Sequence, residues 1–144
     1  MTPSPACRAL IQSFEQCRLA AYLPTPADRP TIGWGATGKD VHLGMTWTRA
    51  QCDERLAADL AGFARGVSAT LTGETTQAQF DALVSLAYNI GLGAFRASGL
   101  LRLHNAGDLA AAAAQFAAWT KQAGQILPGL VRRRAAEAAM YLGG

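Results

Sequence analysis

Two carboxyl groups early in the chain have surroundings suited to acid–base chemistry. Glu15 has the apolar neighbours Phe14 and Tyr22. Asp28 lies in a polar turn flanked by prolines and is the only acid between Glu15 and Asp40. Burial against apolar groups disfavours an ionised carboxyl, whereas solvent and hydrogen bonds favour it. We therefore expect one carboxyl that keeps its proton near neutral pH and a second one that stays charged.

Cleavage of a glycosidic bond needs such a pair. The reaction requires a proton on the leaving oxygen, and a negative charge or an activated water on the opposite face of the sugar. Glu15 is the predicted general acid, and Asp28 is the predicted base or charge stabiliser. Taken singly, a Glu on a helix is usually a solvated surface residue. Asp28 by itself also fits a plain turn former.

Metal and disulfide chemistry are not indicated by the sequence. Cys7, Cys17 and Cys52 are an odd number of cysteines without CxxC spacing, which favours reduced thiols in the core. His42 and His104 have no Cys or acid at ligand spacing, and we interpret them as surface or loop histidines. We therefore expect no metal and no cofactor.

A first helix is predicted to carry Glu15. Pro5 can open a helix, and apolar side chains at helical spacing continue to about Tyr22, before two prolines that forbid continuation. Glu15 is thereby expected in the last turns of this helix.

A small β-region is predicted to follow. Residues 23–47 contain three prolines and several glycines among β-forming residues. This pattern is typical of a short antiparallel hairpin or meander, and Gly38–Asp40 is its predicted turn.

The rest of the chain is predicted to be helical. Thr48 with Gln51, and Thr76 with Gln79, form capping-box patterns that begin two helices. The second of these is apolar all round, which indicates a buried central helix. The predicted helices span about 48–66, 76–91, 94–104, 108–119 and 129–142.

The expected architecture is α+β and mostly helical, as one domain over residues 1–144. The small β-containing lobe is about 23–47, the connecting helix is about 48–66, and the helical lobe combines about 1–22 with 67–144. An apolar content of 50% is ample for a core. We expect a cleft where the two lobes meet.

Several motifs along the chain add specificity through their order. They are Glu15 with Arg18-Leu19-x-x-Tyr22, Thr31-Ile32-Gly33-Trp34-Gly35, Gln79–Leu83, Asn89–Gly91 and Pro128–Glu137. Together these motifs resemble phage-type lysozymes, the glycoside hydrolase family 24 muramidases, over most of the chain. The resemblance implies a lysozyme-like fold in which a helix-borne Glu overhangs a small sheet that grips cell-wall glycan.

The resemblance also implies roles for individual residues. Thr31 would hold the attacking water or line the sugar site, and Gly33 would let glycan approach the backbone. Trp34 would stack on a pyranose ring, although a core position is more usual for such a residue. Asn89 would orient cleft groups, with helix capping as its alternative. These residues are therefore substrate-site candidates.

One departure from the family pattern concerns the second carboxyl. The family commonly has its Asp where this chain has Pro24, and the segment from Glu15 to Thr31 is about one residue longer here. Asp28 must then reach the site by another loop path, or the reaction proceeds without it. In the second case a muramic 6-hydroxyl can attack in place of water, which is lytic transglycosylation.

Three adjacent arginines, Arg132, Arg133 and Arg134, lie near the start of the last predicted helix. Each helical step turns about 100°, so one or two of them at most can face a cleft. Arg133 is our candidate for pairing with Glu15 or a neighbouring acid. The alternative is a solvated surface with aliphatic stems over neighbouring apolar residues.

The implied function is that of an endolysin, a muramidase that hydrolyses the β-1,4 bond between N-acetylmuramic acid and N-acetylglucosamine in peptidoglycan. Besides the transglycosylase, two alternatives remain open: a non-catalytic peptidoglycan-binding module, and membrane disruption by the arginine-bearing terminal helix. Nucleic-acid binding ranks last, because the basic residues form no dense stripe with interleaved aromatics.

Charge and hydropathy bear on partners and location. The net charge of +3 and the pI near 9.0 favour an anionic partner but are too weak to choose one. No secretory signal pattern and no apolar run of about 18 residues appears, so stable membrane insertion is not expected. We expect a monomer held in the host cytoplasm before a holin or another membrane lesion gives it access to the wall.

Overall fold

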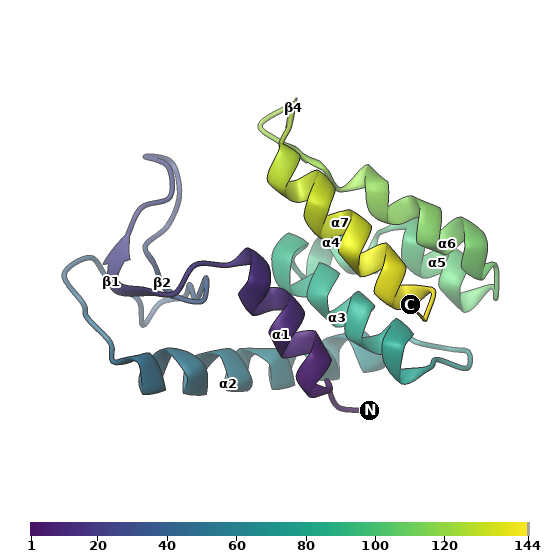
Figure 1. Ribbon diagram of the computed structural model, residues 1–144, viewed down its shortest axis with the longest axis horizontal. Coiled ribbons are helices and arrows are strands. Elements are labelled where there is room, and N and C mark those ends of the chain that lie inside the picture. Colours follow the sequence, from purple (N-terminus) through teal and green to yellow (C-terminus); the bar gives the residue numbers. More distant parts are fainter. Residues whose placement is uncertain (144) are drawn as a thin grey trace.

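A computed structural model describes residues 1–143 of the chain. Figure 1 shows a small β-region at one end of a long helix, with the other helices gathered around the opposite end. The elements in chain order are α1 (Pro5–Phe14), β1 (Arg18–Tyr22), β2 (Thr31–Gly33), α2 (Arg49–Ser68), α3 (Gln77–Ile90), α4 (Leu92–Arg96), α5 (Gly99–Asn105), α6 (Leu109–Gln115), the 3-10 helix η1 (Phe116–Ala118), β3 (Lys121–Gln122), β4 (Gln125–Ile126) and α7 (Pro128–Tyr141). The predicted α+β, mostly helical class is confirmed.

The helix α3 is the centre of the helical region. Its side chains from Gln79 to Ala87 are all buried, and it packs against α1, α2, α4 and α7. The predicted capping boxes are confirmed at α2 and α3, where Thr48 and Thr76 accept from the N–H groups of Gln51 and Gln79. Local sequence signals therefore set where both helices begin.

The β-region has its own small core. Strands β1 and β2 are antiparallel, with Arg18 opposite Gly33 and Tyr22 opposite Thr31. Ile32 contributes to a cluster with Ala36 and Val41 that is separate from the main core. The backbone of α2 continues from this region into the helices, as Figure 1 shows.

The first helix is shorter than we expected. It ends at Phe14, and Glu15 follows it as the C-cap residue with an extended backbone. The reason is tertiary, because the backbone of Arg18–Tyr22 pairs with β2 and with the segment near Trp47, whose N–H donates to the carbonyl of Leu19. The prediction that the helix runs to Tyr22 was wrong, and the β-region begins earlier than residue 23.

The predicted hairpin turn was also misplaced. The segment that connects β1 to β2 is 23–30, not Gly38–Asp40. A turn does form at the latter position, where the N–H of Val41 donates to the carbonyl of Gly38. It leads into a loop that pairs with β1 near residue 46, where Ala20 and Thr46 form an isolated bridge and the N–H of Ala21 donates to the carbonyl of Met45.

The second half of the chain holds more elements than expected. The predicted helix over 94–104 is two helices, α4 and α5, separated near Ser98, and the one over 108–119 is α6 followed by η1. A hairpin of β3 and β4 follows, which the sequence analysis did not predict. Its turn residues Ala123 and Gly124 have φ of 51° and 79°, the combination that joins two short antiparallel strands.

His104 is buried rather than a surface or loop residue, with 2% of its surface exposed. Its Nδ1 contacts the Tyr141 hydroxyl at 2.6 Å, and its Nε2 contacts the Thr75 hydroxyl at 2.9 Å. Both ring nitrogens therefore have partners, which is what permits the burial. His42 is exposed, as expected.

The three cysteines are free thiols, as predicted. Cys7 and Cys52 are core residues, and Cys17 is partly buried against that core. Among the described helices, none combines the length and apolarity that a bilayer span requires.

Candidate active site

Glu15 is held at the junction between the helices and the β-region. Its N–H donates to the carbonyl of Ile11, a fully buried residue of α1, at 2.9 Å. The Glu15 side chain is 26% exposed. The carboxyl is therefore anchored by the helical core and remains reachable from solvent.

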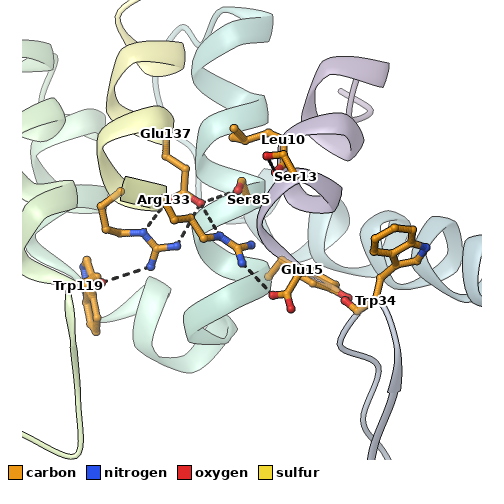
Figure 2. Close-up of polar contacts among 10 residues, drawn as sticks. Leu10, Ser13, Glu15, Trp34, Ser85, Trp119, Arg133 and Glu137 are labelled. Atoms are coloured by element: carbon orange, nitrogen blue, oxygen red, sulfur yellow. Dashed lines mark hydrogen bonds and ion pairs between the residues drawn. The ribbon is translucent and has the colours of Figure 1, made fainter. Parts of the chain in front are cut away.

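Arg133 of α7 binds this carboxyl, as we expected for one of the three arginines. Its Nη1 donates to Oε1 of Glu15 at 2.8 Å, and the arginine side chain is only 4% exposed (Figure 2). An ionised pair at this distance makes a strong, charge-assisted hydrogen bond.

The other oxygen of Glu15 faces a glycine. A Cβ at Gly35 would lie 3.3 Å from Oε2 of Glu15 and 3.7 Å from the hydroxyl of Tyr88. That hydroxyl donates to the backbone carbonyl of Trp34 at 2.8 Å. Burial, with a smaller effect of the Glu15 charge, raises the pKa of Tyr88, so its phenol keeps its proton.

Asp28 occupies the exposed connection between β1 and β2. Its N–H donates to the carbonyl of Thr25 at 3.0 Å, and its carboxylate accepts from the Thr25 hydroxyl at 3.0 Å. Thr31 is buried on β2, and its hydroxyl donates to the carbonyl of Arg29 at 3.1 Å. Within residues 1–143, no hydrogen bond or ion pair joins Glu15, Asp28 and Thr31 to one another.

Gly33 and Trp34 lie where the β-region packs on α2. Gly33 has φ of 66°, and a Cβ there would lie 3.4 Å from Sγ of Cys52. The Trp34 side chain is buried, its Nε1 donates to Asp53 at 2.8 Å, and the guanidinium of Arg49 lies 4.6 Å from its ring centroid. The ring of Trp34 therefore belongs mainly to the core.

Asn89 is exposed at the end of α3. It lines a cavity of about 530 Å³ together with Trp119, Lys121 and other residues of the β3–β4 region. A second cavity of about 740 Å³ lies between residues 1–5 and α2, and no predicted site residue lines it. The Asn89 cavity is therefore the one that shares a residue with the predicted site.

A charged cluster behind Arg133 was not predicted from the sequence. Glu137 is fully buried on α7, where Nε of Arg134 lies 2.6 Å from its Oε1 and Nε of Arg133 lies 3.5 Å from its Oε2. The Ser85 hydroxyl of α3 donates to Oε2 as well (Figure 2). Burial raises the pKa of Glu137, and the two guanidinium groups and Ser85 oppose that rise.

A signal for this cluster was present in the sequence. Glu137 follows Arg133 by four residues and Arg134 by three, which places all three on adjoining parts of one helix face. Arg133 and Arg134 are buried, whereas Arg132 is exposed. Arg133 and Arg134 therefore point into the protein, and Arg133 is the one that reaches Glu15.

Comparisons with known proteins agree on one family. The family model described as "Phage lysozyme" matches residues 12–137. The endolysin of Bacillus phage PZA is 47% identical over 136 residues, which cover 94% of this chain and 53% of that protein. This chain thus spans about half the length of that relative.

Two solved structures are similar over nearly the whole chain. The endolysin from Escherichia coli O157:H7 phage FAHEc1 is 37% identical with a TM-score of 0.87, and the match covers 99% of this chain and 94% of that one. The muramidase domain of SpmX from Asticaccaulis excentricus is 38% identical with a TM-score of 0.88, and the match covers 96% of each chain. The lysozyme-like fold that we expected is confirmed.

Proposed function

Because this chain belongs to the phage lysozyme family, we propose that it is an endolysin that hydrolyses the β-1,4 bond between N-acetylmuramic acid and N-acetylglucosamine in peptidoglycan. The observation that carries the proposal is the setting of Glu15. Its carboxyl is partly exposed, anchored by the helical core and bound by a buried arginine. This is a setting in which a single carboxyl can be held in place and protonated when its charged partner is displaced.

Glu15 acts as the general acid in the proposed reaction. Arg133 donates to its Oε1, so substrate must weaken this bond before the carboxyl can carry the proton that the leaving oxygen needs. Binding of a sugar beside Gly35 brings a polar group to the same carboxyl and excludes water. A less solvated carboxyl takes up a proton more readily.

Asp28 and Thr31 complete the proposed catalytic group. Asp28 is exposed, and water keeps a carboxylate ionised, as required of a base or a charge stabiliser. Thr31 lies on the strand that follows the Asp28 connection, and its hydroxyl positions the attacking water. For the proposed role, the 23–30 connection brings the Asp28 carboxylate toward the bound sugar.

Gly33, Trp34 and Asn89 are proposed contacts for the glycan. Trp34 contributes mainly through its backbone, since its carbonyl accepts from Tyr88 beside Glu15, while its ring is packed against Arg49. Asn89 offers an exposed amide on the cavity near Trp119. The proposed substrate is the glycan strand alone, with no cofactor and no metal.

The test compares cleavage products from purified peptidoglycan. The wild-type protein should release muropeptides with new reducing ends at N-acetylmuramic acid, and Glu15→Gln should lower that rate by roughly 10²–10⁴-fold, as for loss of a general acid. Glu54→Gln, on the exposed surface of α2, is the matched control and should keep the wild-type rate. Wild-type protein without any cleavage would refute the proposed function.

A lytic transglycosylase is the second candidate, and the position of Asp28 favours it. That carboxylate accepts from Thr25 in its own turn, and within the described chain no hydrogen bond or ion pair joins it to Glu15 or Thr31. Without an activated water, the muramic 6-hydroxyl attacks and gives 1,6-anhydro products. Mass spectra in which all products are 1,6-anhydro would establish this alternative and reject hydrolysis.

The proposed location is the host cytoplasm until a membrane lesion releases the protein to the cell wall, where it acts as a monomer. Fractionation of infected or expressing cells before lysis tests the location. Sedimentation at micromolar concentration tests the monomer. Activity in a membrane fraction would contradict the proposed location, and a stable dimer would contradict the monomer.

A further inference from the structure

Arg133 is shared between two carboxylates that lie at different depths. Its Nη1 binds Oε1 of the half-buried Glu15 at 2.8 Å, and its Nε lies 3.5 Å from Oε2 of the fully buried Glu137. The two acids come from opposite ends of the chain, since Glu15 follows α1 and Glu137 is in α7 (Figure 2). A change in the charge of Glu137 therefore affects Glu15 through the guanidinium of Arg133.

The surroundings of Glu137 are those of an ionised carboxylate. Its Oε2 receives the Ser85 hydroxyl, Nε of Arg133 and Nη2 of Arg134, and its Oε1 lies 2.6 Å from Nε of Arg134. The guanidinium donors have no acceptor capacity for a carboxyl proton. Two guanidinium groups against one buried carboxylate leave a positive excess, which Glu15 balances.

Two other titratable groups beside this cluster, Cys7 and Tyr88, keep their protons. Cys7 of α1 has its pKa raised to about 12, mainly by burial and also by the charges of Asp81 and Glu137. Burial raises the pKa of Tyr88 of α3 as well. Beyond Tyr88, Arg55 and Asp59 of α2 pair with each other at 2.9 Å. Ion pairs thus link Glu15 directly to Arg133 and, through it, to Glu137 and Arg134, whereas Arg55 and Asp59 compensate each other.

We propose that Glu137 is a positioning residue for the muramidase reaction, which holds the guanidinium of Arg133 beside Glu15 and offsets part of its positive charge. The proposal rests on the proposed role of Glu15. With Glu137 charged, Arg133 is held between the two carboxyl groups and orients the one of Glu15. Arg134 acts in the opposite sense, because it neutralises Glu137 and so leaves Arg133 more strongly positive toward Glu15.

Substitution of Glu137 and substitution of Arg134 should therefore shift the pH at which Glu15 loses its proton in opposite directions. Glu137→Gln removes the offset, so Arg133 binds the Glu15 carboxylate more strongly and the proton is lost at lower pH. Arg134→Gln leaves Glu137 to offset Arg133 alone, so the proton of Glu15 is kept to higher pH. Screening by solvent is weak at these depths, so a shift of roughly one pH unit is expected in each direction.

The experiment measures kcat/KM on purified peptidoglycan against pH for the wild type, Glu137→Gln, Arg134→Gln and the double variant. The alkaline limb of the profile should move to lower pH in the first variant and to higher pH in the second, and it should return close to the wild-type position in the double variant. Arg132→Gln removes the same charge from the exposed side of α7 and is the matched control, with no movement of the limb.

A second readout does not need activity. The ¹³C carboxyl signal of Glu15 is assigned by its absence in Glu15→Gln. Its titration midpoint should be lowest in Glu137→Gln and highest in Arg134→Gln, with the wild type and the double variant between them. If Glu137→Gln does not fold, the comparison uses Arg134→Gln and the double variant, which retains the charge balance.

The outcomes separate the two proposals. No cleavage by the wild type refutes the proposed function, while the carboxyl titration still tests the coupling. Cleavage that depends on Glu15, with limbs and titrations that do not move or that move in the same direction in both single variants, overturns the role of Glu137 and leaves it a structural ion pair.

Discussion

Gly35 and the carboxyl of Glu15 are in direct apposition, since a Cβ at Gly35 would lie 3.3 Å from Oε2 of Glu15. The backbone at Gly35 has φ of 97°, a conformation that strains any residue with a Cβ. Two independent factors, one conformational and one steric, therefore disfavour a side chain here. The steric one concerns the proposed proton donor.

Gly35→Ala should lower kcat more than its effect on stability accounts for. We expect a loss of about 1–2 kcal/mol of folding free energy from the backbone and at least a tenfold loss of kcat from the displaced carboxyl. Gly107→Ala is the control, because Gly107 has φ of 81° and nothing within 4 Å of its Cβ position. Thermal unfolding and turnover measured for both variants separate a loss of stability from a local effect on Glu15. Equal kcat in the two variants would argue against a steric effect on Glu15.

Replacement of Asp28 by Asn should reduce turnover by roughly 10²–10⁴-fold if the carboxylate activates water. The measurement is the rate of reducing-end formation from peptidoglycan. Thr25→Val disturbs the same turn by removing the hydroxyl that donates to Asp28 but keeps the carboxylate, so it should retain most of the activity. Near wild-type lysis by Asp28→Asn would remove this residue from the mechanism.

Arg133→Gln should destabilise the fold strongly. It leaves Glu137 with one guanidinium fewer in a fully buried site and breaks the bond to Glu15, and removal of one member of a buried ion pair costs about 3–5 kcal/mol. Arg132→Gln, one residue away and exposed, should change the unfolding free energy by less than about 0.5 kcal/mol. Urea unfolding of the two variants is the direct check, and similar midpoints would contradict this account.

Stability should depend on pH through His104. Burial lowers the pKa of His104 from its ordinary value of 6.5, so the unfolded chain binds its proton more readily than the folded one. The contribution to stability is therefore complete above about pH 6.5 and is lost as the pH falls from there toward the folded pKa. Unfolding free energies measured between pH 8 and 5 should show this loss.

Two histidine variants isolate that effect. His104→Gln should flatten the pH dependence in the acidic range, although it lowers stability overall by disturbing the contacts with Tyr141 and Thr75. His42→Gln, at an exposed position, should leave the slope as in the wild type. An unchanged slope in His104→Gln would assign the pH dependence to other groups.

Ala123→Gly should stabilise the protein. Ala123 has a φ of 51° in the β3–β4 turn, and a left-handed backbone costs a residue with a Cβ about 1–2 kcal/mol. Removing the Cβ should raise the free energy of unfolding by about 1 kcal/mol, and the larger entropy that glycine loses on folding reduces this gain. A rise in Tm is expected, and a fall would show that this turn adopts another conformation.

Local signals in the sequence predicted the elements that depend on neighbouring residues. The capping boxes at Thr48 and Thr76 marked the beginnings of α2 and α3, because each box is complete within four residues. The end of α1 was missed, since the fate of Arg18–Tyr22 depends on pairing with β2. Apolar spacing alone did not reveal that partner.

The candidate site shows the same division. The pairing of an arginine with Glu15 was expected and is present at Arg133, whereas Glu137 was overlooked because an acid four residues after an arginine usually lies on a solvated helix face. Its burial becomes apparent only once α7 is packed on α3. The β3–β4 hairpin was missed because each strand has two residues, too few for a period to appear.

The backbone at Glu15 belongs to the helices, while three residues later the chain belongs to the sheet. The N–H of Glu15 is bound to Ile11 in α1, and Arg18 already lies opposite Gly33. Residues 16 and 17 are therefore the short link between the two regions, and Glu15, the proposed proton donor, is fixed by α1 and by Arg133 of α7 rather than by the strands.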